Sequence, residues 1–301
     1  EKAGVALDRI VRMGADSNFW SAGPTGSCGP CSEIYVDLGK DVGCREPDCK
    51  VGCDCDRFLE IWNLVFTEYN RLEDGSLEPL PKKNIDTGMG LERITSVIQN
   101  VESNFETDLL KPILDEAAKM AELVYKNDAK KDFSLRVITD HTRALSMLIN
   151  DGVLPSNDGR GYILRRILRR ASRHGRLIGL KKPFIYKLVD KVVEIMGSAY
   201  PELAKNKEHI KKVVLTEEEK FEKTLDLGIT LAGDEIEKLK KAGKNKIEAD
   251  VSFKLYDTYG FPYELTEEIC QENKIEINFD EFKKKMEEQR EKARNAREVI
   301  K

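Results

Sequence analysis

A change of pattern near residue 108 constrains the fold of this chain more than any other feature of its sequence. Residues 1–108 are rich in glycine, proline and cysteine and contain short β-type segments. From residue 109 onward, apolar residues recur at the three- and four-residue spacing of amphipathic helices. The sequence therefore predicts an α+β domain over 1–108, followed by an all-α domain over 109–301.

The β-type segments of the first domain are separated by turn signals. The stretches "EIYVDL" (33–38) and "EIWNLVFTEYNR" (60–71) mix alternating with continuous apolar character, which is typical of partly or fully buried strands. The stretch "LEDGSLEPLPKKNID" (72–86) contains Asp-Gly, a hairpin signal. The next stretch, "NIDTGMGLERITSVIQ", passes from strand to helix through two glycines.

Bulk composition excludes several classes of protein. Of the 301 residues, 40% are hydrophobic and 35% are charged, which is typical of a soluble globular protein. No apolar run approaches the roughly 20 residues that span a bilayer, so we expect no membrane partner. The net charge of −4 argues against a general nucleic-acid-coating protein. An odd count of seven cysteines, without a signal peptide, predicts a reduced, cytoplasmic protein.

The stretch "IDTGMGLER" has the pattern of a site for a small charged ligand. Asp86 is expected to end a strand, and Gly88 and Gly90 permit a positive φ or a close backbone approach. Arg93 then lies in the first turn of a helix that begins at Leu91. The carboxylate could hold an ammonium group, and the guanidinium could hold a phosphate. The alternative is an ordinary glycine-rich turn with a surface arginine.

An arginine-rich segment, "YILRRILRRASRHGRL" (162–177), predicts a helix with two different faces. At about 100° per residue, the apolar residues gather on one arc: Ile163, Leu164, Ile167, Leu168 and Ala171. Five arginines gather on the opposite arc: Arg165, Arg166, Arg169, Arg170 and Arg173. Their mutual repulsion calls for phosphates or nearby carboxylates. Because residues 159–188 contain few acids, the sequence favours a polyanion such as an RNA backbone.

Two loop residues and a cysteine cluster allow alternative interpretations. Asn157, in "DGVLPSNDGRGY", could read a base edge or cap a turn. Asp257, in "KLYDTYGFP", could accept hydrogen bonds from a base amine or serve as an N-cap. The cysteines Cys44, Cys49, Cys53 and Cys55 could hold structural zinc, although their spacing is unusual and acidic neighbours oppose it. We therefore assign no metal ligand from the sequence alone.

Five stretches together resemble bacterial alanyl-tRNA synthetases of class II, in the order seen in that family. They are "NFWSAGPTGSCGPCSEIYVD", "EIWNLVFTEYNR", "IDTGMGLERI", "DHTRALSMLINDGVLPSNDGRGYILRRILRRASRHG" and "KLYDTYGFP". The resemblance implies part of a class II antiparallel sheet with flanking helices, followed by a helical tRNA-recognition domain. The implied reaction joins alanine to tRNA(Ala) through alanyl-adenylate and uses ATP with Mg²⁺. Some family members carry a Cys/His pattern that begins at Cys28 and Cys31. Here the two histidine positions are Leu38 and Asp41, so Cys28 and Cys31 are interpreted as loop residues.

Site residues carry over from the resemblance position by position. Asp86 matches the carboxylate that binds the alanine ammonium, and Gly88 lines the pocket. Trp20 and Val65 match its walls, with Asn63 beside them. The resemblance places ATP at Gly90 and at Arg93, which holds the phosphates. Asn157 and Asp257 match the pair that reads the G·U base pair of the acceptor stem, and the arginine helix lies along the stem backbone.

The resemblance also implies that this is an internal fragment that lacks motifs 1 and 2 of class II enzymes. We therefore expect the chain alone to be inactive in alanine activation. A non-catalytic module that binds the acceptor stem is the alternative function. A third possibility is a scaffold whose arginine helix only forms ion pairs within the chain.

Overall fold

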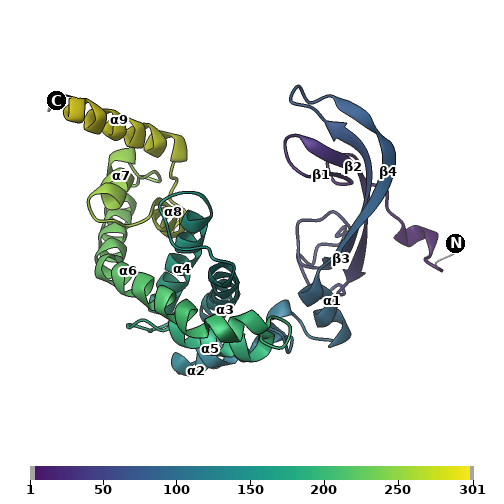
Figure 1. Cartoon of the computed structure of the whole chain (residues 1–301), viewed down its shortest axis with the longest axis horizontal. Coiled ribbons are helices and arrows are strands. Elements are labelled where there is room, and N and C mark those ends of the chain that lie inside the picture. The colour runs from purple at the N-terminus through teal and green to yellow at the C-terminus, as the bar shows by residue number, and fades with distance from the viewer. Residues whose placement is uncertain (1–3, 299–301) are drawn as a thin grey trace. The chain divides into compact units, whose positions relative to one another are not determined.

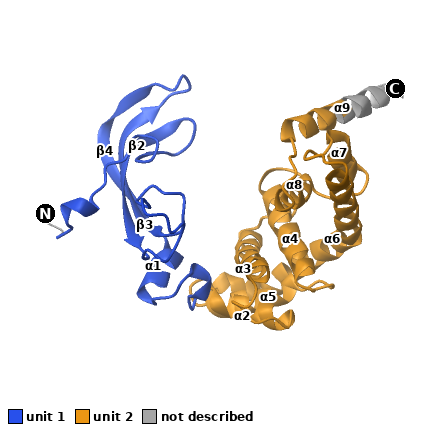
Figure 2. Cartoon of the chain, turned by 180° about the vertical axis from the view of Figure 1, so that it is seen from behind, with its two compact units in different colours: residues 1–109 blue, residues 110–301 orange. Residues whose placement is uncertain are grey.

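The computed structural model describes residues 4–298, and side chains as far as residue 288. The chain divides into two compact units, residues 1–109 and 110–301, which Figure 2 shows in two colours. The first is called the sheet unit and the second the helical unit. The predicted change from β-rich to helical structure is confirmed by the order of elements in Figure 1.

The sheet unit is built on a four-stranded antiparallel sheet in the order β1-β2-β3-β4. Its strands are β1 (Phe19–Ser21), β2 (Gly26–Asp37), β3 (Phe58–Arg71) and β4 (Leu77–Met89). Asp74 shapes the β3–β4 turn because its carboxylate accepts hydrogen bonds from the backbone and hydroxyl of Ser76. The predicted Asp-Gly hairpin and the antiparallel sheet are therefore confirmed.

Short helical segments flank this sheet in the sequence. They are η1 (Leu7–Arg9), α1 (Leu91–Ile98) and η2 (Asn104–Glu106), of which η1 and η2 are single 3₁₀ turns. Helix α1 begins at Leu91, as predicted. Strand β4, however, continues to Met89, so Asp86 lies within the strand and not at its end.

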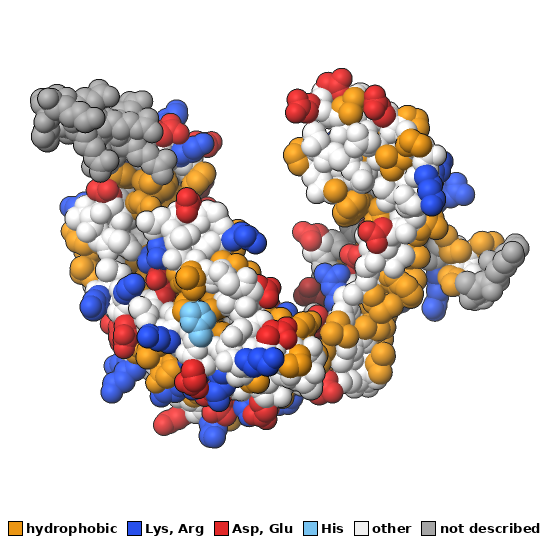
Figure 3. Space-filling model, in the orientation of Figure 1, with side chains coloured by type: hydrophobic (Ala, Val, Ile, Leu, Met, Phe, Trp, Pro, Cys, Tyr) orange, Lys and Arg blue, Asp and Glu red, His pale blue; other side chains and the backbone are white. Residues whose placement is uncertain are grey.

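The sheet unit buries few side chains. Among its described residues, the buried hydrophobic side chains are those of Cys28, Cys31 and Val65. The expectation that the two cysteines lie in a loop is wrong, because both belong to β2. Strand β4 is exposed along almost its whole length, and Ile85 is 65% exposed. Hydrophobic side chains are accordingly visible at the surface of this unit in Figure 3.

The helical unit contains eight helices in its described residues. They are α2 (Lys111–Met120), α3 (Ala129–Asn150), α4 (Gly159–Leu177), α5 (Ile185–Met196), α6 (Pro201–Lys241), α7 (Ala249–Asp257), α8 (Tyr263–Glu272) and α9 (Phe279–Glu298). The strongly charged C-terminal segment is helical as expected, although its last three residues lie outside the described part of the chain.

Two groups of buried side chains hold these helices together. Leu135, Leu164 and Leu188, on α3, α4 and α5, have no exposed surface. A second core joins the later half of α6 to α7, α8 and the segments that connect them. There, the ring of Phe261 lies directly on Gly228, where a Cβ atom would stand 2.0 Å from a ring carbon. Glycine therefore lets the ring pack against the helix backbone.

A buried carboxylate links α6 to the start of α5. Glu218 accepts hydrogen bonds from the backbone N–H groups of Phe184, Ile185 and Tyr186 at 2.9 to 3.0 Å. These groups lie at the beginning of a helix, where N–H donors have no partner within the helix. Burial raises the pKa of Glu218 to about 7, against the lowering effect of the three donors.

Candidate functional site

The sheet register brings together four of the five residues that the sequence assigns to amino-acid binding. Asn63 lies opposite Gly88, and Val65 lies opposite Asp86, on adjacent strands β3 and β4. Residues two apart on a strand point to the same face, and opposite Cβ atoms stand about 4.5–5.5 Å apart. The four residues therefore form one patch on one face of the sheet, called here the β3–β4 patch.

Trp20 lies elsewhere in the sheet. It is on β1, opposite Gly29 of β2, and its side chain is partly exposed. Strand β2 stands between β1 and the two strands of the patch. The register therefore does not bring Trp20 next to the other four residues.

A carboxylate that the sequence analysis missed extends the β3–β4 patch onto β2. Glu33 pairs with Asn63 in the register and accepts a hydrogen bond from its amide nitrogen at 3.2 Å. It also accepts from the hydroxyl of Tyr35 and from the Cys31 thiol. Burial and the Glu33 carboxylate raise the pKa of the Cys31 thiol. The sequence did contain a signal for Glu33. The alternation in "CSEIY" places residues 31, 33 and 35 on one face of the strand.

Arg93 is held at the start of α1 by the neighbouring strand. Its Nη1 atom donates to the carbonyl oxygen of Glu60 at 2.9 Å and lies 3.6 Å from that residue's carboxylate. Gly90 is the N-cap of α1 with a φ of −72°, and its N–H donates to the carbonyl of Ile61. Neither Gly88 nor Gly90 has the positive φ that the sequence allowed. A Cβ at Gly88 would meet no atom within 4 Å, so the space beside it is open.

The arginine face of α4 is largely neutralised within the chain. Arg165 and Arg169 contact Glu217 of α6 at 3.0 and 3.1 Å. Arg170 and Arg173 contact Glu268 of α8 at 3.0 and 3.1 Å. The alternative of intramolecular carboxylate partners is therefore observed for four of the five arginines. The acidic content of residues 159–188 did not predict these ion pairs, because the carboxylate partners lie about 50 and 100 residues further along the chain.

The fifth arginine differs from the others. Arg166 is exposed and makes no ion pair with any described residue. Arg173, by contrast, is buried, with its side chain 3% exposed, and also contacts Glu272 at 2.7 Å. The prediction of a clean apolar arc is wrong for Ile163, which is exposed.

Glu268 is the centre of this ionic network. Its carboxylate also lies 3.1 Å from Nε2 of the buried His174. Burial opposes ionisation of Glu268. The hydrogen bond from His174 and the charges of Arg173 and Arg170 outweigh burial and lower its pKa to about 2.

A cavity of about 690 Å³ lies where α4, α7, α8 and α9 meet. Asn157 and Arg166 line it together with Tyr256, and its wall also carries other aromatic and charged side chains: Tyr162, Tyr263, Glu264, Glu267, Phe279, Phe282 and Lys283. Asn157 accepts a hydrogen bond from Arg165. Asp257 is exposed and is the last residue of α7, so the alternative that it is an N-cap is wrong.

Comparison with known proteins identifies the family. The family model for class II tRNA synthetases (A) matches residues 1–301. The chain belongs to the class II tRNA synthetases. It is 63% identical, over its full length, to the alanine–tRNA ligase of Fusobacterium nucleatum, of which it covers 35%. It is 54% identical over 99% of its length to the alanine–tRNA ligase of Carboxydothermus hydrogenoformans, covering 34% of that protein.

This synthetase chain thus spans about a third of the length of the curated relatives that it matches. The expected resemblance to the alanyl-tRNA synthetase family is confirmed, as is the expected class II fold. No helix among residues 4–298 is long and apolar enough to cross a membrane.

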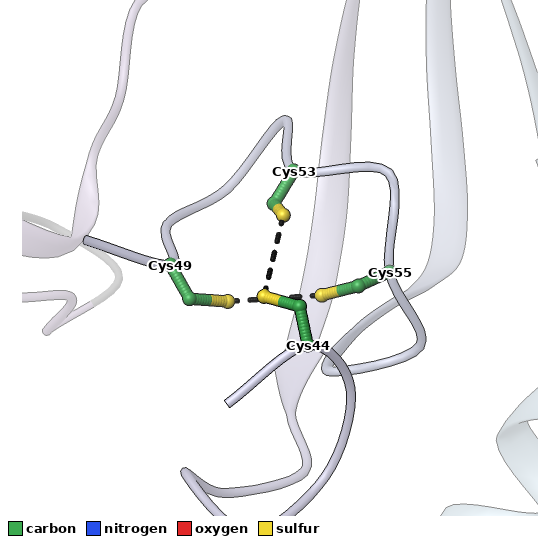
Figure 4. A group of neighbouring side chains, drawn as sticks. All are labelled: Cys44, Cys49, Cys53 and Cys55. Atoms are coloured by element: carbon green, nitrogen blue, oxygen red, sulfur yellow. Dashed lines mark hydrogen bonds between the residues drawn. The ribbon is translucent and has the colours of Figure 1, made fainter. Parts of the chain in front are cut away.

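The synthetase chain also contains a cysteine cluster outside the β3–β4 patch. Cys44, Cys49, Cys53 and Cys55 point toward one another, as Figure 4 shows, and their sulfur atoms all lie within 4.8 Å of one another. Backbone N–H donors at Arg57 and Cys44 lower the pKa of the Cys55 thiol to about 7, whereas the hydrogen bond with Cys55 raises the pKa of Cys53 to about 12 and burial raises the pKa of Cys49. The closeness of the four sulfur atoms makes the cluster a candidate metal site that the sequence left open.

Proposed function

We propose that this chain is the alanine-binding and acceptor-stem-binding part of an alanine–tRNA ligase. The complete enzyme forms alanyl-adenylate from alanine and ATP, with release of pyrophosphate, and transfers alanine to tRNA(Ala). The observation that carries the proposal is the register of β3 and β4, in which Val65–Asp86 and Asn63–Gly88 form adjacent pairs on one face. The names of the relatives support the choice of alanine.

In this proposal, the β3–β4 patch binds the amino acid. The Asp86 carboxylate is exposed and accepts hydrogen bonds from the alanine ammonium. Val65 contacts the methyl group, and Gly88 keeps the neighbouring space free. Trp20 forms a further wall, which requires β1 to approach the bound amino acid. Asn63 is oriented by its hydrogen bond to Glu33.

ATP is proposed to bind beside this patch, at Gly90 and Arg93. The Arg93 guanidinium uses one Nη atom on the Glu60 carbonyl, and its remaining donors suit phosphate oxygens. Its place in the first turn of α1 adds the positive end of the helix dipole. Mg²⁺ enters with ATP, because it binds phosphates and usually keeps several waters.

The helical unit is proposed to bind the acceptor stem of tRNA(Ala). Asn157 and Asp257 are exposed polar side chains, which suits them to read the G·U pair. Among the five arginines of this face, Arg166 is the one best placed for direct phosphate contact, because it is exposed and makes no ion pair within the described part of the chain. Arg165, Arg169, Arg170 and Arg173 act chiefly by holding the elements that carry the reading residues.

Alanine binding is the decisive test of the catalytic part. We would measure binding of a non-hydrolysable alanyl-adenylate analogue by calorimetry for the chain and two variants. Asp86→Asn should weaken binding at least tenfold, because it removes the charge that faces the ammonium. Glu78→Gln, which changes another exposed acid of β4, should bind like the parent chain. Equal affinities for all three proteins would refute the alanine site.

RNA binding tests the helical part. Fluorescence anisotropy across a salt series would compare hairpins with G·U and with G·C at the recognised position. A preference for G·U that is lost in Asn157→Ala or Asp257→Ala would support specific recognition. Equal and salt-steep binding would reduce the claim to a basic RNA-binding face that does not read the G·U pair. The second candidate function is a non-catalytic module that binds the acceptor stem, and the helical unit has buried side chains of its own on which such a module could fold.

A further inference from the structure

The long connection between β2 and β3 is organised around its cysteines. Residues 38–57 contain no helix or strand, and none of their hydrophobic side chains is buried. Loops of this length without secondary structure are uncommon in compact domains. Its base is closed by an ion pair of 2.8 Å between Arg57 and Asp37. Something beyond apolar packing must therefore fix the remainder of the loop.

The four sulfur atoms already stand at metal-binding distances. Cys44 and Cys53 are 3.7 Å apart at sulfur, as are Cys49 and Cys55, and all four sulfurs lie within 4.8 Å of one another. A tetrahedral zinc ion with Zn–S bonds of about 2.3 Å would hold its sulfur ligands about 3.8 Å apart. Disulfide bonds would require sulfur–sulfur distances near 2.05 Å. The arrangement in Figure 4 therefore fits four thiolates around one ion.

We propose that Cys44, Cys49, Cys53 and Cys55 bind one structural zinc ion. Four thiolates complete the tetrahedral shell and leave no position for water or substrate, which is typical of a structural site. The bound site carries a net charge of −2, from four thiolates and one divalent cation. A four-iron cluster fits less well, because each thiolate would bind a different iron and the sulfurs would stand farther apart.

The surroundings of the cluster support a built site. Gly43 has a φ of +81°, and a Cβ there would stand 2.8 Å from the Cys55 sulfur. Glycine suits this position both because of the positive φ and because there is no space for a Cβ atom beside the sulfur. The Arg57 guanidinium donates to the Cys49 carbonyl at 3.3 Å. Such outer contacts orient metal ligands, and Arg57 offsets part of the negative charge.

The ion would fix the end of the β2–β3 hairpin that lies nearest to α1. Arg57 precedes Phe58, where β3 begins. Two residues later, Glu60 contacts Arg93 through both its carbonyl and its carboxylate. Zinc thus acts structurally, by ordering a loop that adjoins the strand holding Arg93, and takes no part in the chemistry.

Metal content is the direct test. We would purify the chain under reducing conditions and measure zinc and iron by inductively coupled plasma mass spectrometry. We expect one zinc ion per chain in the parent protein. The zinc content should fall at least tenfold in Cys53→Ser and stay unchanged in Asp54→Ser. Asp54→Ser is the matched control, because it places serine between the same two cysteines without removing a ligand.

Cobalt substitution and limited proteolysis use the parent chain, so their results do not depend on whether Cys53→Ser folds correctly. Cobalt added to the metal-free parent chain should give the intense visible absorption of a tetrahedral tetrathiolate. Removal of the ion by a chelator should expose residues 38–57 to protease, and added zinc should reverse this. Zinc content unchanged in Cys53→Ser, iron in place of zinc, or no tetrahedral cobalt spectrum would each overturn the proposal. None of these results depends on aminoacylation, so they are separate from the tests of the proposed function.

Discussion

The two units of this chain bury their side chains to very different degrees. In the described part of the sheet unit, Cys28, Cys31 and Val65 are the buried hydrophobic residues, whereas every helix from α2 to α8 of the helical unit contributes to a buried interior. In the β3–β4 patch, buried Val65 lies opposite exposed Asp86, and Gly88 is exposed as well. A small ligand needs exposed groups of this kind, while recognition of a large surface needs side chains held by a rigid support. The comparison suggests that stability and ligand contact are divided between the units.

The largest effect is expected from removing the central carboxylate of the helical unit. Glu268→Ala would leave Arg170, Arg173 and His174 without a shared partner. Breaking a buried ion pair in this way costs about 3–5 kcal/mol. Far-ultraviolet circular dichroism in urea, which reports mainly on helices, should show the loss. Glu219→Ala, at an exposed position of α6, is the control and should change little.

A core truncation should separate the two units. Leu168→Ala removes a side chain with no exposed surface and should cost about 3 kcal/mol. Both tryptophans, Trp20 and Trp62, lie in the sheet unit, so their fluorescence reports on that unit alone. We expect the urea unfolding transition of the helical unit, followed by circular dichroism, to shift to lower urea concentration. The transition of the sheet unit, followed by tryptophan fluorescence, should not shift. A joint shift of both transitions would mean that the units unfold as one.

A pair of glycine substitutions on α6 tests the second core. Gly228→Ala should cost about 1–3 kcal/mol, because the new methyl group overlaps the ring of Phe261. Gly233→Ala, five residues along the same helix, meets no atom within 4 Å and should stabilise by about 0.5–1 kcal/mol. A lower melting temperature for Gly228→Ala and a higher one for Gly233→Ala would support the packing of Phe261 on Gly228. Shifts of the melting temperature in the same direction would contradict it.

Acid should weaken the helical unit through Glu268. Its folded pKa of about 2 lies below the ordinary 4.5, so its contribution is present above pH 4.5 and is lost as pH falls toward 2. Glu218 has the opposite sign, because its pKa is raised to about 7 and its ionisation costs stability between pH 4.5 and 7. We would measure the urea midpoint of unfolding as a function of pH. Glu268→Gln should reduce the pH dependence of the midpoint between pH 2 and 4.5, and Glu218→Gln should reduce it between pH 4.5 and 7.

The smallest effect is expected on the exposed strand of the sheet. Ile85→Ala removes a side chain that is 65% exposed and should change stability by less than about 0.5 kcal/mol. The fluorescence transition of the sheet unit would measure it. A loss as large as that of Leu168→Ala would show that another molecule covers β4 in solution.

The sequence predicted the order of elements well and the ionic contacts poorly. Periodicity located α4, and Asp-Gly located the β3–β4 turn, because both signals are local. The partners of the arginines could not be predicted, because Glu217 and Glu268 come from helices far along the chain. Buried Arg173 and exposed Ile163 show the same limit, since each position depends on which neighbouring helix covers it.

The candidate site was predictable as a list of residues but not as an arrangement. Family resemblance named Asn63, Val65, Asp86 and Gly88, and only the register showed that they form two facing pairs. Glu33 escaped notice because strand alternation alone does not distinguish an exposed carboxylate from one that orients Asn63. The cysteine spacing was unusual, so the closeness of the four sulfurs became visible only in three dimensions.

The length of α6 has a mechanical consequence. The helix runs from Pro201 to Lys241, roughly 60 Å at 1.5 Å per residue. Glu217 and Glu218 fasten it to α4 and α5, while its later half forms the core with α7 and α8. A helix fastened in this way acts as a lever, because a tilt of about 5° at the fastened part moves the end of the helix, about 35 Å away at 1.5 Å per residue, by about 3 Å. A force applied to α7 or α8 would therefore also act, through α6, on the helix that carries the arginines.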